Sequence, residues 1–258
     1  MKILNSFVRR LAAPLCFAAL LIGTNAAWPQ IPGSDKSSGG MNTAMIKFFG
    51  ANTNFISKAD LRVLDKNQQE TTSMPIGFQM LGNRMRMDVN MSEVKSRDIS
   101  PEFAATMKSM GMDQMVTIWL PDKKTVISIY PNLKSYAETP MSKDEVDTAA
   151  IAYQTEKTRA GRETIDGHAC EKNNVTLTDP KGNQQHAVVW NATDLKDFPI
   201  QIQMPGDDVT VVLKFKDVKI GKPDASHFDA PEGLKKFDNI SALISDATVK
   251  RMSANGPK

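Results

Sequence analysis

Cysteine is almost absent from this sequence, which has two cysteines, Cys16 and Cys170, in 258 residues. Cys16 lies in an N-terminal segment that we expect to be removed, so the mature chain keeps a single thiol and forms no internal disulfide. A lone cysteine in an oxidising compartment is either buried or free to pair with another molecule. The apolar neighbours Ala169 and Val175 favour a buried Cys170.

Catalytic motifs are also absent. The sequence has no Gly-x-Ser-x-Gly elbow, no phosphate-binding loop and no His-Glu-x-x-His pair. Its acidic residues fall mostly in turns, helix caps and the solvent-facing sides of expected strands, so no two carboxyl groups are set up for acid–base catalysis. We therefore expect no catalytic residues, no cofactor and no enzymatic activity.

A metal site would be an alternative use of the three histidines. His168 and Cys170 fall on one side of an expected strand, at a spacing that suits half a metal site or a thiol beside its base. His186 and His227 stand alone, and no second pair has matching spacing. The sequence therefore favours a surface histidine and a buried cysteine, with no metal.

The first 26 residues have the layout of a secretory signal peptide. Lys2, Arg9 and Arg10 precede an apolar run over residues 11–22, and small residues around Ala26 follow it. The run is shorter than the roughly 20 residues that span a bilayer. We therefore expect cleavage near Ala26 and an exported mature protein.

Charge is balanced once this segment is removed. Residues 27–258 hold 29 basic and 29 acidic residues, so the formal charge of +3 belongs to the signal peptide. A neutral chain gives no reason to expect binding to nucleic acid or to an anionic membrane. Residues 27–44 are rich in Pro, Gly and Ser and indicate a flexible leader. We expect one domain over residues 45–237, then an amphipathic helix and tail over residues 238–258.

Alternating apolar residues predict strands along most of this domain. The sharpest alternation sets Met85, Met87, Val89 and Met91 against polar neighbours, so one face of that strand is nearly all methionine. A strand around Trp119 is apolar on both faces, as expected if one face meets the core and the other a helix or ligand. A long strand begins at Val209, and the chain from Glu163 onward is almost wholly β.

Three helices are expected among these strands. Ser100 caps the first, in which Phe103, Met107 and Met110 recur at helical spacing. A capping box over residues 142–145 begins the second, which we expect to run to about Gln154. The third covers about residues 239–253, with Asp238 as its cap. The pattern predicts a mainly β (α+β) fold, in which a strongly curved antiparallel sheet holds helices on its concave face.

The methionines offer three interpretations. Flexible thioether side chains suit a cavity that must repack around variable acyl chains. They also fill ordinary cores, and methionine can bind copper(I), although the only close Met-x-Met runs are Met85-Arg86-Met87 and Met110-Gly111-Met112. The candidate cavity-lining residues are Met85, Met87, Val89, Met91, Phe103, Met107, Met110 and Trp119.

Several motifs resemble one family. The segment KIGKPDASHFDAPEGLKKF (residues 219–237) is similar to the terminal signature of the periplasmic lipoprotein-carrier superfamily (LolA, LolB, LppX), a last long strand with a Pro-Asp-x-x-x-Phe knuckle and a Pro-x-Gly turn. The segment over residues 161–170 resembles the G-x-E-x-I-x-G-x-x-C segment of a branch of unknown function. A Trp190 strand followed by Phe198-Pro199 fits the same pattern. The resemblance covers about residues 55–237.

This resemblance implies an unclosed half-barrel with helices as a lid over a hydrophobic cavity. It implies binding of a lipid, an acyl chain or a lipoprotein, as a carrier or a sensor in the periplasm. The alternative is an envelope protein-interaction module with a filled core, whose edge strand binds a protein partner. The sequence does not identify the cargo, the partner or the oligomeric state.

Overall fold

The structure, a computed structural model, describes residues 45–97 and 99–254. The predicted signal peptide and leader therefore lie outside the described residues. No helix in the described ranges is long and apolar enough to cross a membrane. The elements are β1 (Asn54–Asp65), β2 (Glu70–Leu81), β3 (Arg84–Asn90), η1 (Met91–Glu93), β4 (Lys95–Ser96), α3 (Pro101–Ser109), β5 (Gln114–Leu120), η2 (Pro121–Lys123), β6 (Thr125–Tyr130), η3 (Pro131–Leu133), β7 (Ser135–Pro140), α4 (Lys143–Ala150), β8 (Gln154–Ile165), β9 (His168–Thr178), β10 (Gln184–Ala192), η4 (Thr193–Leu195), β11 (Phe198–Pro205), β12 (Val209–Ile220), η5 (Ala225–Phe228), β13 (Lys235–Phe237) and α5 (Ile240–Ala254).

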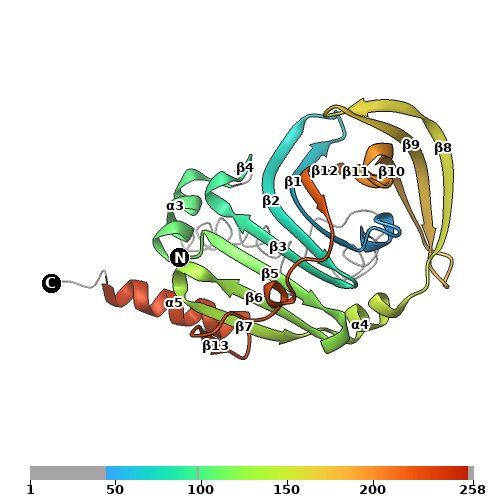
Figure 1. Ribbon diagram of the computed structural model, residues 1–258. Coiled ribbons are helices and arrows are strands. Elements are labelled where there is room, and N and C mark those ends of the chain that lie inside the picture. Colours follow the sequence, from blue (N-terminus) through green and yellow to red (C-terminus); the bar gives the residue numbers. More distant parts are fainter. Residues whose placement is uncertain (1–44, 98, 255–258) are drawn as a thin grey trace.

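One large sheet organises the chain. Its order is β13-β7-β6-β5-β3-β2-β1-β12-β11-β10-β9-β8, with β4 paired to β2 beside this path. Neighbouring strands are antiparallel except β13, which pairs parallel with β7. The sheet curls strongly but is not closed, since its end strands β8 and β13 do not pair (Figure 1). The predicted fold class, a mainly β protein with an unclosed curved sheet, is confirmed.

The concave face of the sheet carries the main core. Antiparallel register places Phe55, Met80, Met85, Trp119 and Val126 in one row across five strands. All five side chains are buried. Because side chains alternate between the two faces of a strand, the polar residues of β3 face the opposite side. The predicted methionine face of this strand is therefore the core face.

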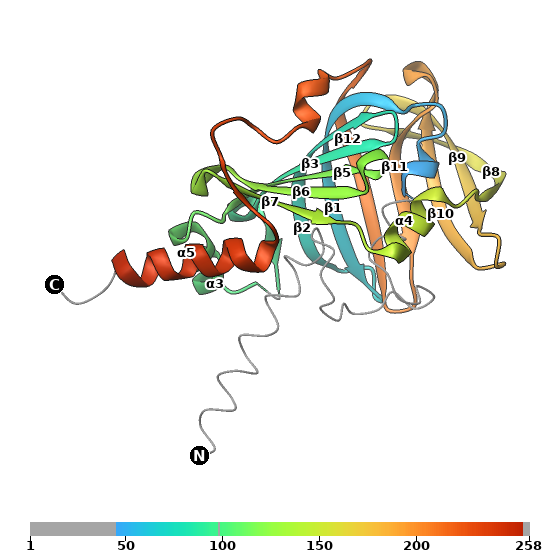
Figure 2. The ribbon, with the colours of Figure 1, turned by 90° about the horizontal axis from the view of Figure 1, so that it is seen from below.

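The convex face has its own smaller core over β5 and β6. Val116, Ile118 and Leu120 lie on this face and cluster with Phe228 of η5, which is fully buried. The second apolar face predicted for the Trp119 strand is thus covered by the C-terminal segment of the same chain. In Figure 2 this segment lies on one side of the sheet, whereas α5, which packs on β7, lies on the other side.

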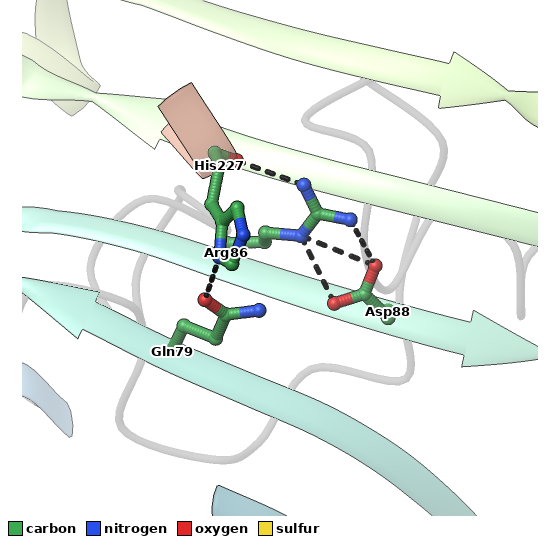
Figure 3. Close-up of polar contacts among 4 residues, drawn as sticks. All are labelled: Gln79, Arg86, Asp88 and His227. Carbon is green, nitrogen blue, oxygen red and sulfur yellow. Dashed lines mark hydrogen bonds and ion pairs between the residues drawn. The ribbon is translucent and has the colours of Figure 1, made fainter. Parts of the chain in front are cut away.

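Polar contacts fix η5 against the convex face (Figure 3). Arg86 on β3 donates from Nη1 to the carbonyl oxygen of His227 at 2.8 Å. Its other guanidinium nitrogens donate to the carboxylate of Asp88, with the shortest contact at 2.7 Å. The His227 ring pairs with Oε1 of Gln79 on β2 at 2.9 Å. Arg86 and Gln79 therefore hold the C-terminal segment in place through His227, and Asp88 orients Arg86.

The helices differ from the expectation in their extent and packing. Ser100 caps α3 by accepting from the Phe103 amide at 3.2 Å, as predicted, but no residue of α3 is buried. The capping box of α4 is present, with Glu145 Oε2 accepting from the Ser142 amide at 2.7 Å. However, α4 ends at Ala150 because the chain then enters β8.

The C-terminal helix α5 packs on β7 and β13 through Ile240, Leu243 and Ala247, all of which are buried. Its predicted extent is close to the observed one, but its predicted cap is wrong. Asn239, rather than Asp238, accepts from the amide of Ala242 at 2.8 Å.

Strand β8 is the main element that the sequence did not predict. It begins at Gln154, where a helix was expected to end, and pairs only with β9. Its side chains are exposed on both faces except at Gly161 and Ile165, which are partly exposed. A strand exposed on both faces carries no apolar alternation, so its sequence gives no strand signal.

Candidate functional site

The candidate site is the concave face of β2, β3 and β5. We call it the methionine wall and define it by Met74, Met80, Met85, Met87 and Met115. Each of these side chains is at least 95% buried. Val89 pairs with Met115 and with Ile76, and Trp119 pairs with Met85. The resulting surface is apolar and conformationally adaptable, because thioether side chains have three rotatable bonds.

An aromatic cluster continues the wall toward β11 and β12. Phe55, Phe78, Phe198 and Phe215 lie on four strands, and Phe49 lies among them. The Phe49 ring centroid is 4.9 to 5.8 Å from the other four ring centroids, within the range of favourable aromatic contacts. Phe49 follows the helical turn at residues 45–48. The segment just before β1 therefore packs inside the curved sheet.

One polar atom interrupts the apolar wall. Thr117 on β5 lies between Met87 on β3 and Ser128 on β6. Both hydroxyl side chains are 1% exposed. The Oγ1 atom of Thr117 is the only fully buried side-chain nitrogen or oxygen in the described ranges that has no hydrogen-bond partner. A buried hydroxyl without a partner is unfavourable, and such atoms are rare in proteins.

The predicted site residues fall into two groups. Met85, Met87, Val89, Met91 and Trp119 are all buried in the main core. Met107 and Met110 are partly buried at the margin of that core. Phe103 is partly exposed and belongs to neither core cluster. The strand residues thus come together, whereas α3 lies beside η1 instead of over the wall.

The concave face also contains buried residues that the sequence analysis did not name as site residues. Phe49, Phe55, Phe78 and Thr117 belong to the same concave face. The alternation of Thr117 with Met115 and Trp119 was visible in the sequence and could have placed it there. The contribution of Phe49 could not be found in this way, because it depends on the path of the chain before β1.

The residues around Cys170 form a polar surface outside the wall. Cys170 is 2% exposed, and its burial raises the pKa of the thiol. His168 Nδ1 lies 2.7 Å from a carboxylate oxygen of Asp194, and this contact lowers the pKa of Asp194. The prediction of a buried cysteine is confirmed. In the described ranges, no three His, Cys, Asp or Glu side chains are placed to hold a metal ion.

Glu163 on β8 holds a second polar contact in this region. Lys172 Nζ donates to its Oε1 at 2.7 Å, and Trp190 Nε1 donates to its Oε2 at 2.8 Å. These two hydrogen bonds lower the pKa of Glu163, with the Lys172 bond as the larger cause. Lys172 Nζ also lies 5.0 Å from the Trp190 ring centroid. The arrangement joins β8, β9 and β10 at the exposed end of the sheet.

Comparison with known proteins gives a family. The family described as "Domain of unknown function (DUF4412)" matches residues 65–208. No curated protein shows significant similarity to the sequence.

Several solved structures are similar at low identity. They include the lipoprotein LppX of Mycobacterium tuberculosis (12% identity, TM-score 0.39, 74% of this chain and 99% of that chain). A LolA superfamily protein of Nitrosomonas europaea is 10% identical (TM-score 0.34, 73% of this chain and 97% of that chain). A chain of the Pseudomonas aeruginosa MucA/MucB complex is 8% identical (TM-score 0.35, 76% of this chain and 62% of that chain). The predicted branch of unknown function agrees with the match to the DUF4412 family.

Proposed function

This chain belongs to the DUF4412 family, and we propose that it binds a lipid, an acyl chain or the acyl part of a lipoprotein on its methionine wall. It does so as an exported periplasmic protein without enzymatic activity, in the role of a carrier or a sensor. The single observation that carries this proposal is the largely apolar concave face on a sheet that does not close.

The energetics of such binding follow from the wall. Moving an acyl chain from water onto apolar side chains contributes about 0.8 kcal/mol for each buried methylene group. Met85 and Met87 can change rotamer to fit chains of different shape, which aromatic or β-branched residues do less easily. The wall is buried in this structure, so ligand entry requires a covering segment to move.

Two segments are suited to that movement. The segment at residues 45–49 inserts into the curved sheet but precedes its first strand, so it can leave without breaking strand pairing. Helix α4 connects β7 to β8 and thus links the two arms of the sheet. The helical lid that the resemblance implies is proposed here for α4 only, because no residue of α3 is buried.

Tryptophan quenching tests the proposal with an internal control. Trp119 lies in the wall, whereas Trp190 lies on β10 and is hydrogen-bonded to Glu163. In a Trp28→Phe background, a brominated acyl chain should quench the fluorescence of Trp119. Quenching should persist in the Trp190→Phe variant and disappear in the Trp119→Phe variant. Absence of quenching, together with native mass spectra free of lipid, would contradict acyl binding.

A second candidate function is supported by β8. This strand ends the sheet and is exposed on both faces, so one of its edges is open to a strand from another protein. An envelope protein that pairs with β8 would make the chain an interaction module. Recovery of one stoichiometric protein from the envelope, with no lipid bound, would favour this function over acyl binding.

A further inference from the structure

Thr117 Oγ1 is the only fully buried side-chain nitrogen or oxygen in the described ranges that has no hydrogen-bond partner. It lies on the face where we propose that the ligand binds. Its row across the sheet is Met87, Thr117, Ser128 and Ala137. One neighbouring row holds Met85, Trp119 and Val126, and the other holds Val89 and Met115. The hydroxyl therefore faces the same side as the methionine wall, beside Ser128 and otherwise among apolar side chains.

The polar groups of the protein do not satisfy this hydroxyl. Other hydroxyls of the sheet reach a backbone carbonyl, as Ser57 does to Phe78 and Thr71 does to Val63, whereas Thr117 Oγ1 has no hydrogen-bond partner. By contrast, the buried hydroxyl of Thr72 on β2 pairs with Ser96 Oγ at 2.9 Å. The fold thus provides a partner for one buried threonine and none for the other.

The absence of positive charge around Thr117 restricts which ligand group can pair with its hydroxyl. Lys, Arg and His are absent from these three rows, and the charged residues of β3 face the convex side. An ionised carboxylate in such surroundings would lose its hydration without gaining a counter-charge, which is strongly unfavourable. A neutral carbonyl oxygen can accept from the hydroxyl with a much smaller loss of hydration.

We infer that Thr117 selects ligands that carry a neutral ester carbonyl next to their acyl chain, in preference to free fatty-acid anions or plain hydrocarbon. This inference rests on the proposed acyl-binding function and specifies the class of ligand. Acyl esters occur in glycerolipids and in the acylated end of lipoproteins, and the shared chemistry is the ester oxygen. Thr117 acts as a specificity-determining residue, because the apolar wall supplies the binding of the chain itself.

A competition assay tests the inference. A fatty-acid methyl ester, the ionised fatty acid and an alkane of equal chain length compete with a fluorescent acyl probe for the mature protein. The ester should bind about fivefold to tenfold more tightly than the alkane, the size expected for one buried hydrogen bond. In the Thr117→Val variant this preference should vanish. The Thr117→Ser variant should keep the preference.

The controls separate the two proposals. Thermal melting of Thr117→Val establishes that the variant is folded, and valine closely matches threonine in shape. Equal binding of ester and alkane by the unaltered protein, or an ester preference that survives in Thr117→Val, would overturn the role of Thr117 while acyl binding stands. If none of the three compounds displaces the fluorescent probe from the protein, both this inference and the proposed function fail.

Discussion

Arg86 on β3 and His227 in η5 are joined by a hydrogen bond of 2.8 Å, although they are 141 residues apart in the sequence. The bond ties the C-terminal knuckle to the sheet beside Phe228, which covers the convex core. The knuckle that resembles the terminal signature of the lipoprotein carriers is therefore a structural cover rather than part of the concave site.

Replacement of Arg86 by Ala should loosen this cover. Loss of a hydrogen bond from a charged donor costs about 1.5–3 kcal/mol of unfolding free energy. Hydrogen exchange at residues 225–234 should rise in the variant. Arg84→Ala is the matched control, since Arg84 on the same strand pairs with Asp122 near the surface and its loss costs about 0–1 kcal/mol. Equal effects from the two variants would contradict the proposed attachment.

Phe49→Ala should destabilise the protein strongly. The side chain is 1% exposed and touches four other phenylalanine rings, so its removal leaves a cavity that costs about 3–5 kcal/mol. Chemical denaturation measures this change. Phe103→Ala on α3 serves as the control, because Phe103 lies outside both cores, and should cost much less. A small effect at Phe49 would show that residues 45–49 do not pack inside the sheet in solution.

Thr117→Val and Thr72→Val should have different effects on the free energy of unfolding. The first removes a buried hydroxyl that has no partner, so unfolding free energy should stay constant or rise by about 1 kcal/mol. The second removes the hydrogen bond to Ser96, so unfolding free energy should fall by about 1 kcal/mol. Urea denaturation of both variants gives the comparison. A clear loss of stability in Thr117→Val would mean that this hydroxyl has a partner in the unliganded protein.

Glu163 should contribute to the pH dependence of stability. Its pKa in the folded protein is held below the ordinary value of 4.5 by the hydrogen bonds from Lys172 and Trp190. A lowered folded pKa means that the stabilisation is present above pH 4.5 and is lost as the pH falls through the folded pKa. Melting temperatures between neutral pH and pH 3 should therefore fall less steeply in Glu163→Gln than in the unaltered protein. Glu156→Gln on the same exposed strand is the control, and an unchanged slope in Glu163→Gln would refute the assignment.

Much of this fold was predictable because one-sided burial leaves a period of two in the sequence. The alternation at Met85 and Met87 predicted both the strand and its buried face. The capping signals at Ser100 and in the 142–145 box also identified real helix starts. These features depend on neighbours within a few residues.

The missed features depend on distant partners. β8 could not be identified because it is exposed on both faces and exists only through its pairing with β9. The partner of the convex apolar face, Phe228, lies more than a hundred residues from Ile118. The spacing of Met107 and Met110 predicted a helix but not its position, and α3 lies at the margin rather than over the wall.

The pairing of β1 with β12 has a consequence for how the chain matures. These strands lie side by side near the middle of the sheet. Phe55 of β1 pairs with Ile220 of β12, so this edge of β1 stays unpaired until the chain has been made as far as β12. Until then β1 has an unsatisfied edge with an apolar face, the kind of surface that invites aggregation. Contacts between such distant segments also form slowly. Assembly of the full sheet therefore requires almost the entire polypeptide, because β12 lies near its C-terminal end.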